Sequence, residues 1–327
     1  MPYVIGVDLG GTNFAVGAVS TDGAQQRTFT SELTRRERGA DDIVGRIATR
    51  VADVIARTIA ETGASEADFL GVGIGAPGPL RRIDGVVVLA PNLGWRDYPL
   101  RDRVAAAVGL PCTLENDANC ATVAEWWIGA AKGAKNVVGV TIGTGIGGGL
   151  IIDGALYHGS SDVAGEIGHT TIETAGRRCK CGNYGCLEAY ASGPAIAERA
   201  RESLDANGAS SLSALAGGDP MALTAQHVFD AARNGDALAI EVVRDTARYL
   251  GAGIANLLNI FNPEVVVLAG GVTGAGAQLL APLQAEVRRR AFRPAVDVVR
   301  IVPGTLGDRA GVVGAAAAFL AETGKGA

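Results

Sequence analysis

One short segment, residues 166–188, constrains this chain more than any other part of its sequence. It carries one histidine and three cysteines, at His169, Cys179, Cys181 and Cys186. One nitrogen and three sulfurs make a complete tetrahedral ligand set for zinc. A pair of buried or unpartnered thiols would explain neither the third cysteine nor the glycines between them. The sequence therefore predicts a structural zinc site, because four protein ligands leave no open position for water.

Two carboxylates stand beside these ligands. Glu166 lies three residues before His169, and Glu188 lies two residues after Cys186. Fixing the metal ligands also fixes both carboxylates, and a rigid pair of acceptors suits the neighbouring hydroxyls of a sugar. A metal-bound imidazole usually donates through its second ring nitrogen. We therefore expect Glu166, Glu188 and His169 to bind a sugar.

Two glycine-rich turns, in residues 8–13 and 143–149, each stand between apolar strands. The first alone could be a plain hairpin, but a strand-end carboxylate suits magnesium and free amides suit phosphate. The Gly-x-Gly-x-x-Gly match in the second precedes a strand, whereas a dinucleotide-binding fold requires a helix there, and no P-loop motif is present. The repetition therefore predicts a duplicated phosphate-binding device. Its candidate residues are Asp8, Gly10, Gly11, Thr12, Asn13, Gly143, Thr144 and Gly145.

A third candidate carboxylate, Asp117, falls between a strand predicted over 111–114 and a helix predicted over 121–129. Asp and Asn are preferred helix caps, so Asp117 could serve only as a cap. Asn116 or Asn119 could cap the helix equally well, which leaves Asp117 for other work. Asp117 is therefore the candidate catalytic residue.

Two further loops offer weaker signals. Asn92 lies in a polar turn and could bind a hydroxyl, although a plain Asx turn explains it as well. Gly270 and Gly271 follow a buried strand, where exposed backbone could approach an adenine ring or simply begin a helix. His158 and His227 lie in no ligand pattern, and we predict no role for them.

The remaining chain alternates between strand and helix patterns. Residues 43–59 have apolar positions at helical spacing and predict an amphipathic helix over a sheet. A strand at 69–75 follows, residues 193–261 are largely helical, and a last strand is predicted at 296–302 before a final helix at 308–322. The pattern is that of an α/β protein.

Composition excludes several classes of function. With 327 residues the chain can form two domains, and its net charge of −5 without a basic run argues against nucleic acid and anionic membranes. No signal peptide or membrane span is expected. Cys112 and Cys120 are expected to be buried thiols, and the five cysteines suit a reducing cytoplasm.

Taken in chain order, these motifs resemble the ROK family, and within it the bacterial ATP-dependent glucokinase branch. The resemblance implies a duplicated actin-like (ribonuclease-H-like) α/β fold, whose two domains close an interdomain cleft over sugar and ATP. We expect a small N-terminal α/β domain at 1–117, completed by a helix at 308–327, and a large α/β domain at 118–307. The motifs that carry the resemblance are Asp8-Leu-Gly-Gly-Thr-Asn13, Glu115-Asn-Asp-Ala-Asn119, Gly143-Thr-Gly-Ile-Gly147, Glu166-Ile-Gly-His169 and Cys179-x-Cys-Gly-x-x-Gly-Cys-Leu-Glu188.

The resemblance also implies an activity, namely transfer of the γ-phosphoryl group of ATP to the 6-hydroxyl of glucose. Asp117 would be the general base, Mg²⁺ would accompany ATP, and zinc would be structural. The implied sugar contacts are Asn92, Asn116, Asp117, Glu166, His169 and Glu188. We expect a cytoplasmic homo-oligomer, a dimer or tetramer, without nucleic-acid or membrane partners.

Three alternatives stay open. The acceptor could be another hexose, such as N-acetylmannosamine, fructose or mannose, since paired carboxylates would bind most hexoses. The donor could be polyphosphate, and the chain could be a sugar sensor without catalysis. A DNA-binding repressor is not expected, because the repressors of this family carry a helix-turn-helix module before the first glycine turn, and here seven residues precede Asp8.

Overall fold

The computed structural model describes residues 1–207 and 210–325. Packing divides the chain into two compact units, and β10 (Ile146–Ile152) runs from the second into the first. The first unit comprises Met1–Lys135, Gly149–Gly165 and Gly304–Ala327, and the second comprises Asn136–Gly148 and Glu166–Pro303. None of the described helices combines the length and the hydropathy that a bilayer crossing requires.

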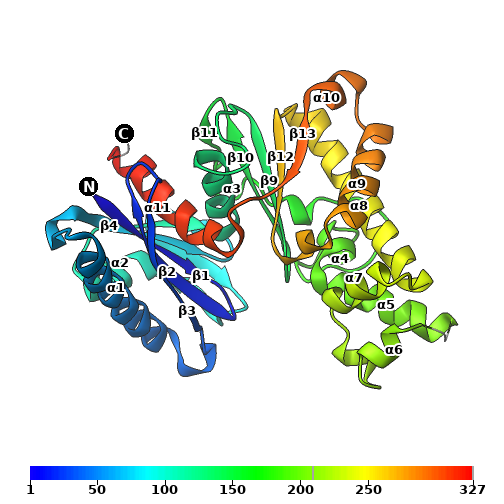
Figure 1. Cartoon of the computed structure of the whole chain (residues 1–327), viewed down its shortest axis with the longest axis horizontal. Coiled ribbons are helices and arrows are strands. Elements are labelled where there is room, and N and C mark those ends of the chain that lie inside the picture. Colours follow the sequence, from blue (N-terminus) through cyan, green and yellow to red (C-terminus); the bar gives the residue numbers. More distant parts are fainter. Residues whose placement is uncertain (208–209, 326–327) are drawn as a thin grey trace. The chain divides into compact units, whose positions relative to one another are not determined.

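The first unit contains a five-stranded sheet (Figure 1). Its strands lie in the order β3 (Gln26–Leu33), β2 (Asn13–Ser20), β1 (Tyr3–Leu9), β4 (Phe69–Ala76) and β8 (Cys112–Asn116). β1 and β2 form an antiparallel hairpin around the first glycine turn, whereas β1, β4 and β8 are parallel. Asp8 pairs with Gly75, and Gly75 with Glu115. Asp8 and Glu115 therefore lie near the carboxyl ends of their strands, at one edge of the sheet.

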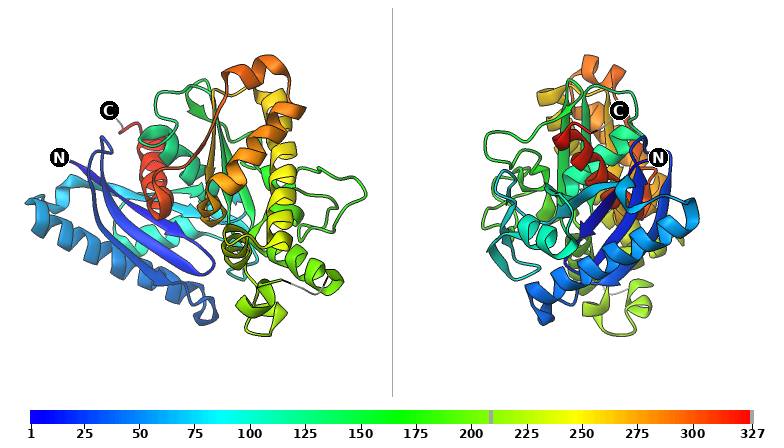
Figure 2. Two further views of the ribbon diagram at one scale, coloured as in Figure 1. Left: turned by 45° about the vertical axis from the view of Figure 1, so that its right-hand side comes forward. Right: turned by 90° about the vertical axis from the view of Figure 1, so that its left-hand side faces the viewer.

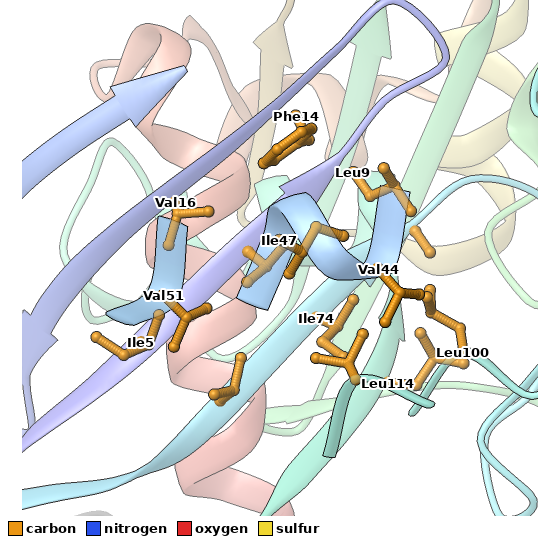
Figure 3. Close-up of a cluster of buried hydrophobic side chains, with 14 of the residues drawn as sticks. Ile5, Leu9, Phe14, Val16, Val44, Ile47, Val51, Ile74, Leu100 and Leu114 are labelled. Carbon is orange, nitrogen blue, oxygen red and sulfur yellow. The ribbon is translucent and has the colours of Figure 1, made fainter. Parts of the chain in front are cut away.

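Helices cover both faces of this sheet. α1 (Ala40–Thr62) and α2 (Leu100–Val108) pack over the apolar side chains of one face, among them Ile5, Leu9 and Phe14 (Figure 3). Alternate strand residues point to the opposite face, where Val4 packs with residues of α3 (Asp117–Trp127) and α11 (Ala310–Thr323). A Cβ atom on Gly6 would lie 1.9 Å from the carbonyl oxygen of Val312. Glycine on this strand therefore lets α11 lie close against the sheet.

A small antiparallel sheet completes the first unit. It consists of β5 (Leu80–Arg81), β6 (Val86–Ala90) and β7 (Trp95–Tyr98). Neither this sheet nor β3 was predicted from the sequence. The predicted domain boundary after residue 117 remains a prediction. The packed unit continues to Lys135, because α3 packs against α11.

A second five-stranded sheet repeats the plan of the first. Its order is β11 (Ala155–Leu156), β10, β9 (Val137–Ile142), β12 (Val265–Ala269) and β13 (Arg300–Pro303). β12 runs parallel to both β9 and β13, as β4 does to β1 and β8. The helices of the second unit are α4 (Glu188–Ala191), α5 (Gly193–Asn207), α6 (Leu212–Leu215), α7 (Ala225–Arg233), α8 (Ala237–Phe261), α9 (Ala277–Arg290) and α10 (Arg293–Val298). The segment before α4 has little regular secondary structure (Figure 2).

Three predicted boundaries were wrong. Residues 296–298 end α10 and are not part of a strand, because Pro294 suits the first helical turn and Arg293 pairs with Asp297 one turn on. Residues 146–149 belong to β10 rather than to the second glycine turn. α3 begins at Asp117, four residues before the predicted start of that helix.

Candidate functional site

The four predicted metal ligands come together in the second unit. One ligand atom from each of His169, Cys179, Cys181 and Cys186 lies within 4.8 Å of all the others. The sulfur atoms of Cys181 and Cys186 are 3.7 Å apart, and Nδ1 of His169 is 3.7 Å from the sulfur of Cys179. Zinc–sulfur bonds of about 2.3 Å in a tetrahedron imply sulfur–sulfur edges of roughly 3.8 Å. The donor atoms therefore fit a metal ion, and the free cysteines form no disulfide.

Glycines shape the backbone of residues 169–186, the segment that carries the four ligands and is called the metal loop below. Gly185 has φ +72°, and a Cβ atom on it would lie 1.7 Å from the carbonyl oxygen of Glu173. Gly182 has φ +99°, and its N–H donates to the carbonyl of Cys179. Both conformations favour glycine over other residues. The glycines that the zinc interpretation required between the cysteines are thus explained by turn geometry.

His169 presents its two ring nitrogens to different partners. Nδ1 faces Cys179, while Nε2 lies 3.9 Å from a carboxylate oxygen of Glu166. The side chains of His169 and Glu166 are 35% and 43% exposed, so both can be reached by a small molecule. One imidazole can therefore bind a metal ion through Nδ1 and a ligand oxygen through Nε2.

Glu188 joins the metal loop to the second glycine turn. It begins α4, and its Oε2 accepts a hydrogen bond of 2.9 Å from the backbone N–H of Ile146. Its Oε1 lies 3.9 Å from the sulfur of Cys179. A Cβ atom on Gly145 would lie 2.6 Å from Oε2, so glycine at this position leaves room for the carboxylate.

A cavity of about 490 Å³ lies beside the same turn in the second unit. Its wall includes Gly143 and Thr144 of the turn and Gly271, and thus joins residues from two predicted phosphate or adenine loops. Gly270 has φ +91°, and a Cβ atom there would lie 2.5 Å from the carbonyl of Ile142. The volume is within the usual range for small-molecule sites.

The helical wall of this cavity was not predicted from the sequence. That wall includes Pro194, Ala197 and Arg201 of α5, and Phe229 of α7. Helical periodicity shows which face of a helix is apolar, but it does not show whether that face meets a core or a cavity. Pro194 at the start of α5 was the one local signal, and it is equally typical of an ordinary helix start.

In the first unit, the glycine turn lies next to Asp8 and Asn92. The N–H of Gly10 donates to the carbonyl of Asn13, which closes the turn, and Thr12 and Asn13 are exposed. A Cβ atom on Gly11 would lie 2.9 Å from Cβ of Asn92, so this predicted sugar contact lies against the turn. Burial raises the pKa of Asp8 from 3.8 to about 6.

Asn116 caps α3. Its side-chain oxygen accepts from the N–H groups of Ala118 and Asn119, at 2.9 and 3.2 Å. Asp117 is the first helical residue, and its Oδ1 accepts from the N–H of Ala118. Asn116 therefore satisfies the first turn of the helix, as the sequence analysis allowed. A role for Asp117 beyond this local bond stays a prediction.

One contact near Asp117 was not anticipated. His158, to which we had assigned no role, lies with Nε2 2.8 Å from a carboxylate oxygen of Glu115. Glu115 is buried in β8, directly before Asn116. No sequence signal marked this pair, because 43 residues separate its members.

The repeated sheet plan and the glycine turn after the first strand of each sheet define the class. The protein has the duplicated, actin-like α/β fold of the sugar kinases. The model of the ROK family matches residues 4–322, and the chain belongs to this family. The predicted fold class and the predicted family are both confirmed.

Known relatives match the chain over nearly its full length. A glucokinase of Halalkalibacterium halodurans is 40% identical over 313 residues, which cover 95% of this chain and 93% of the relative. A ROK family glucokinase from Streptomyces griseus, solved in complex with glucose and AMPPNP, is 37% identical with a TM-score of 0.83, and the match covers 97% of this chain and 98% of that one. A ROK hexokinase from Thermus thermophilus is 32% identical with a TM-score of 0.79, covering 99% and 100%.

Proposed function

We propose that this protein is a glucokinase that transfers the γ-phosphoryl group of ATP to the 6-hydroxyl of glucose. The observation that carries the proposal is its similarity, over nearly the whole chain, to glucokinases, one of which binds glucose and AMPPNP. The side chains that this chemistry needs are present, among them Asp117 and Glu188 at helix starts and Asn92 in a turn. We also propose that the protein acts in the cytoplasm as a homo-oligomer.

Asp117 is the proposed general base. It would accept the proton of the 6-hydroxyl as the oxygen attacks, a contribution of about 10²- to 10⁴-fold in rate. The capped first turn of α3 supports this assignment, because the Asn116 side chain accepts from two N–H groups of that turn and fixes the backbone at Asp117. Asn116 and Asn92 are proposed sugar contacts from the same unit.

In the second unit, Glu166, His169 and Glu188 are the proposed sugar contacts. The four-ligand cluster would hold zinc, which would act as a structural ion because the ligand set is closed. Metal binding through Nδ1 of His169 would fix the ring and leave Nε2 to donate to a sugar oxygen. The bond from Ile146 to Glu188 keeps that carboxylate in one orientation.

The cavity beside Gly143 and Gly271 is the proposed site of the adenine base. Its mostly apolar wall suits a flat ring. The amides of both glycine turns would bind phosphate oxygens, and Asp8 would hold the magnesium ion that neutralises phosphate charge. Alignment and charge neutralisation supply most of the acceleration in phosphoryl transfer, which needs little covalent help from the protein.

The test is an assay of the purified protein with magnesium, a panel of hexoses, and either ATP or polyphosphate. We expect glucose 6-phosphate and ADP, with kcat/KM for glucose above that for mannose, fructose and N-acetylmannosamine. Faster turnover of another hexose, or turnover with polyphosphate alone, would change the assigned acceptor or donor. Tight glucose binding without any turnover would replace the kinase by a sugar sensor. Metal analysis should find one zinc per chain.

A further inference from the structure

The carboxylate of Glu115 is buried in the first unit, directly before the residues to which catalysis is assigned. Glu115 is 2% exposed and lies near the end of β8, and Asn116 and Asp117 follow it. An ionised carboxylate removed from water is strongly destabilising unless it is paired and hydrogen-bonded. Its partners therefore indicate what this side chain does.

The two oxygens of Glu115 have different partners. Oε1 accepts from the backbone N–H of Asn116 at 2.8 Å and from Nδ2 of Asn119 at 2.9 Å, both at the start of α3. Oε2 lies 2.8 Å from Nε2 of His158 and 3.0 Å from Nε of Arg82. One oxygen thus holds the helix start, while the other is held by two side chains from distant loops.

His158 supplies the directional bond to Oε2. Nε of Arg82 lies close to Oε2, but among the described residues it makes no hydrogen bond. Arg82 therefore contributes its charge. Burial raises the pKa of Glu115, but the hydrogen bond from His158 and the charge of Arg82 outweigh burial and hold this pKa below its usual range. An ionised carboxylate only accepts, so Nε2 of His158 must carry the hydrogen.

Both partners are themselves held in place. The backbone N–H of Arg82 donates to Asp162 at 3.1 Å, and its Nη2 lies 2.9 Å from Glu322 on α11. The carbonyl of His158 accepts from the N–H of Ala164 at 3.1 Å. The loop between β11 and the metal segment is therefore tied to the same cluster as the end of β8.

We infer that His158 is a positioning residue for Asp117. With Arg82 it fixes the Glu115 carboxylate. Oε1 of that carboxylate holds the first turn of α3, and with it the direction of the Asp117 side chain. The inference rests on the proposed function, in which Asp117 is the base. Misplacement of a reacting group by about 1 Å can lower a rate about 100-fold, so a contact behind the base can control turnover.

Three variants separate this role from simple stabilisation. His158→Leu removes the donor, and His158→Gln keeps an N–H of similar reach. Glu322→Gln is the matched control, because it keeps an oxygen that accepts from Nη2 of Arg82 and removes only a partly exposed charge. We expect kcat to fall about 10- to 100-fold in His158→Leu with the KM for ATP unchanged. His158→Gln should stay within about threefold of the parent, because a donor to Oε2 remains. Glu322→Gln should match the parent.

Hydrogen exchange provides a readout that does not depend on activity. The N–H groups of Asn116, Ala118 and Asn119 exchange their hydrogens with solvent only when the helix start opens. We expect faster exchange of the peptide 112–124 in His158→Leu, parent-like exchange in His158→Gln, and no change in Glu322→Gln. If His158→Leu does not fold, Glu115→Gln takes its place, since an amide cannot satisfy both donor sets.

The outcomes distinguish the inference from the function on which it rests. An active parent with normal kcat and normal exchange in His158→Leu would overturn the inference and leave the kinase assignment intact. Equal losses in His158→Leu and His158→Gln would also overturn it, because the donor would then not matter. A parent without kinase activity would refute the proposed function, and unchanged exchange at the helix start would then refute the positioning contact as well.

Discussion

Glu188 accepts a hydrogen bond of 2.9 Å from the backbone N–H of Ile146, and this bond connects the start of α4 to the start of β10, directly after the second glycine turn. The same carboxylate is a proposed sugar contact, so one side chain would both bind the sugar and hold the backbone at Ile146. Glu188→Gln keeps an oxygen for the Ile146 N–H but loses the negative charge. We expect the glucose KM to rise about tenfold or more, since hydrogen bonds to charged groups contribute about 1.5–3 kcal/mol. Binding of AMPPNP without sugar should be unchanged.

Glu188→Ala is the contrasting variant. It removes the oxygen that accepts from the N–H of Ile146, a residue beside the turn that lines the cavity. AMPPNP affinity should therefore fall together with glucose affinity. Calorimetric titration of each ligand separately measures both effects. Equal losses for glucose and AMPPNP in Glu188→Gln would argue against a direct sugar contact.

Asp117→Asn tests the general base. An amide cannot accept the hydroxyl proton, so we expect kcat to fall at least about 100-fold while glucose affinity is retained. The fold should tolerate the change, because Asn116 caps α3. Asn116→Ala is the structural comparison and should lower the free energy of unfolding by about 1 kcal/mol. Turnover of Asp117→Asn near that of the parent would remove Asp117 as the base.

The features predicted from the sequence are those that local spacing determines. His169 and the three cysteines fall within 18 residues, so their residue types alone identify a ligand set. Close approach of a neighbouring group favours glycine at Gly145, and a positive φ together with close backbone approach favours it at Gly270, so both positions carry a local sequence signal. The Asn116 cap was one of three that the sequence allowed, beside Asp117 and Asn119.

The features that were missed depend on tertiary packing. The pair of His158 and Glu115 brings together two loops that no periodicity connects. β3 escaped notice because it is an edge strand of mostly polar residues, partly or fully exposed, without a clear alternation. Residues 296–298 contain valines typical of strands, but Pro294 and the pair of Arg293 with Asp297 favour a helix. Local propensity was outweighed by helix-start chemistry in that segment.

Cys181→Ser tests the metal cluster. The hydroxyl is a poor zinc ligand, so we expect loss of the bound metal and a weaker affinity for glucose, since Glu166 and Glu188 flank the ligands. Cys112→Ser is the matched control. Its sulfur contacts the carbonyl of Leu110 in the first unit, outside the cluster, so metal content should stay at that of the parent. Plasma emission spectrometry of purified protein gives the metal content directly, and full occupancy in Cys181→Ser would contradict the ligand set.

Gly271→Val tests the nucleotide cavity. A Cβ atom on Gly271 meets no atom within 4 Å, so a larger side chain extends into open space at the cavity wall without disturbing the fold. We expect the KM for ATP to rise at least about tenfold through steric exclusion of the base, with glucose affinity unchanged. Gly274→Val is the control, because Gly274 is equally open but does not line the cavity. If both variants bind AMPPNP as the parent does, the base lies elsewhere.

Asp8, the proposed magnesium ligand, should lower the free energy of unfolding of the protein at neutral pH. Burial raises its pKa from 3.8 to about 6, so the folded protein retains this proton where the unfolded chain has lost it. Below pH 3.8 both states are protonated and the carboxyl carries no penalty. As the pH rises through about 6, the folded state becomes less stable by about 3 kcal/mol, since each unit of pKa shift corresponds to about 1.4 kcal/mol.

Asp8→Asn removes this penalty because an amide does not ionise. We expect the variant to exceed the parent in the free energy of unfolding by up to about 3 kcal/mol at pH 7.5, with the difference disappearing near pH 4. Asp53→Asn, an exposed carboxylate on α1, should differ from the parent by less than about 0.5 kcal/mol at either pH. Magnesium and AMPPNP should stabilise the parent more than Asp8→Asn, because the ligand binds only the folded state and the variant lacks the carboxylate. Thermal unfolding of each protein at both pH values, with and without magnesium and AMPPNP, measures these differences in stability. Equal stabilisation of the parent and Asp8→Asn by the nucleotide would exclude Asp8 from the metal site.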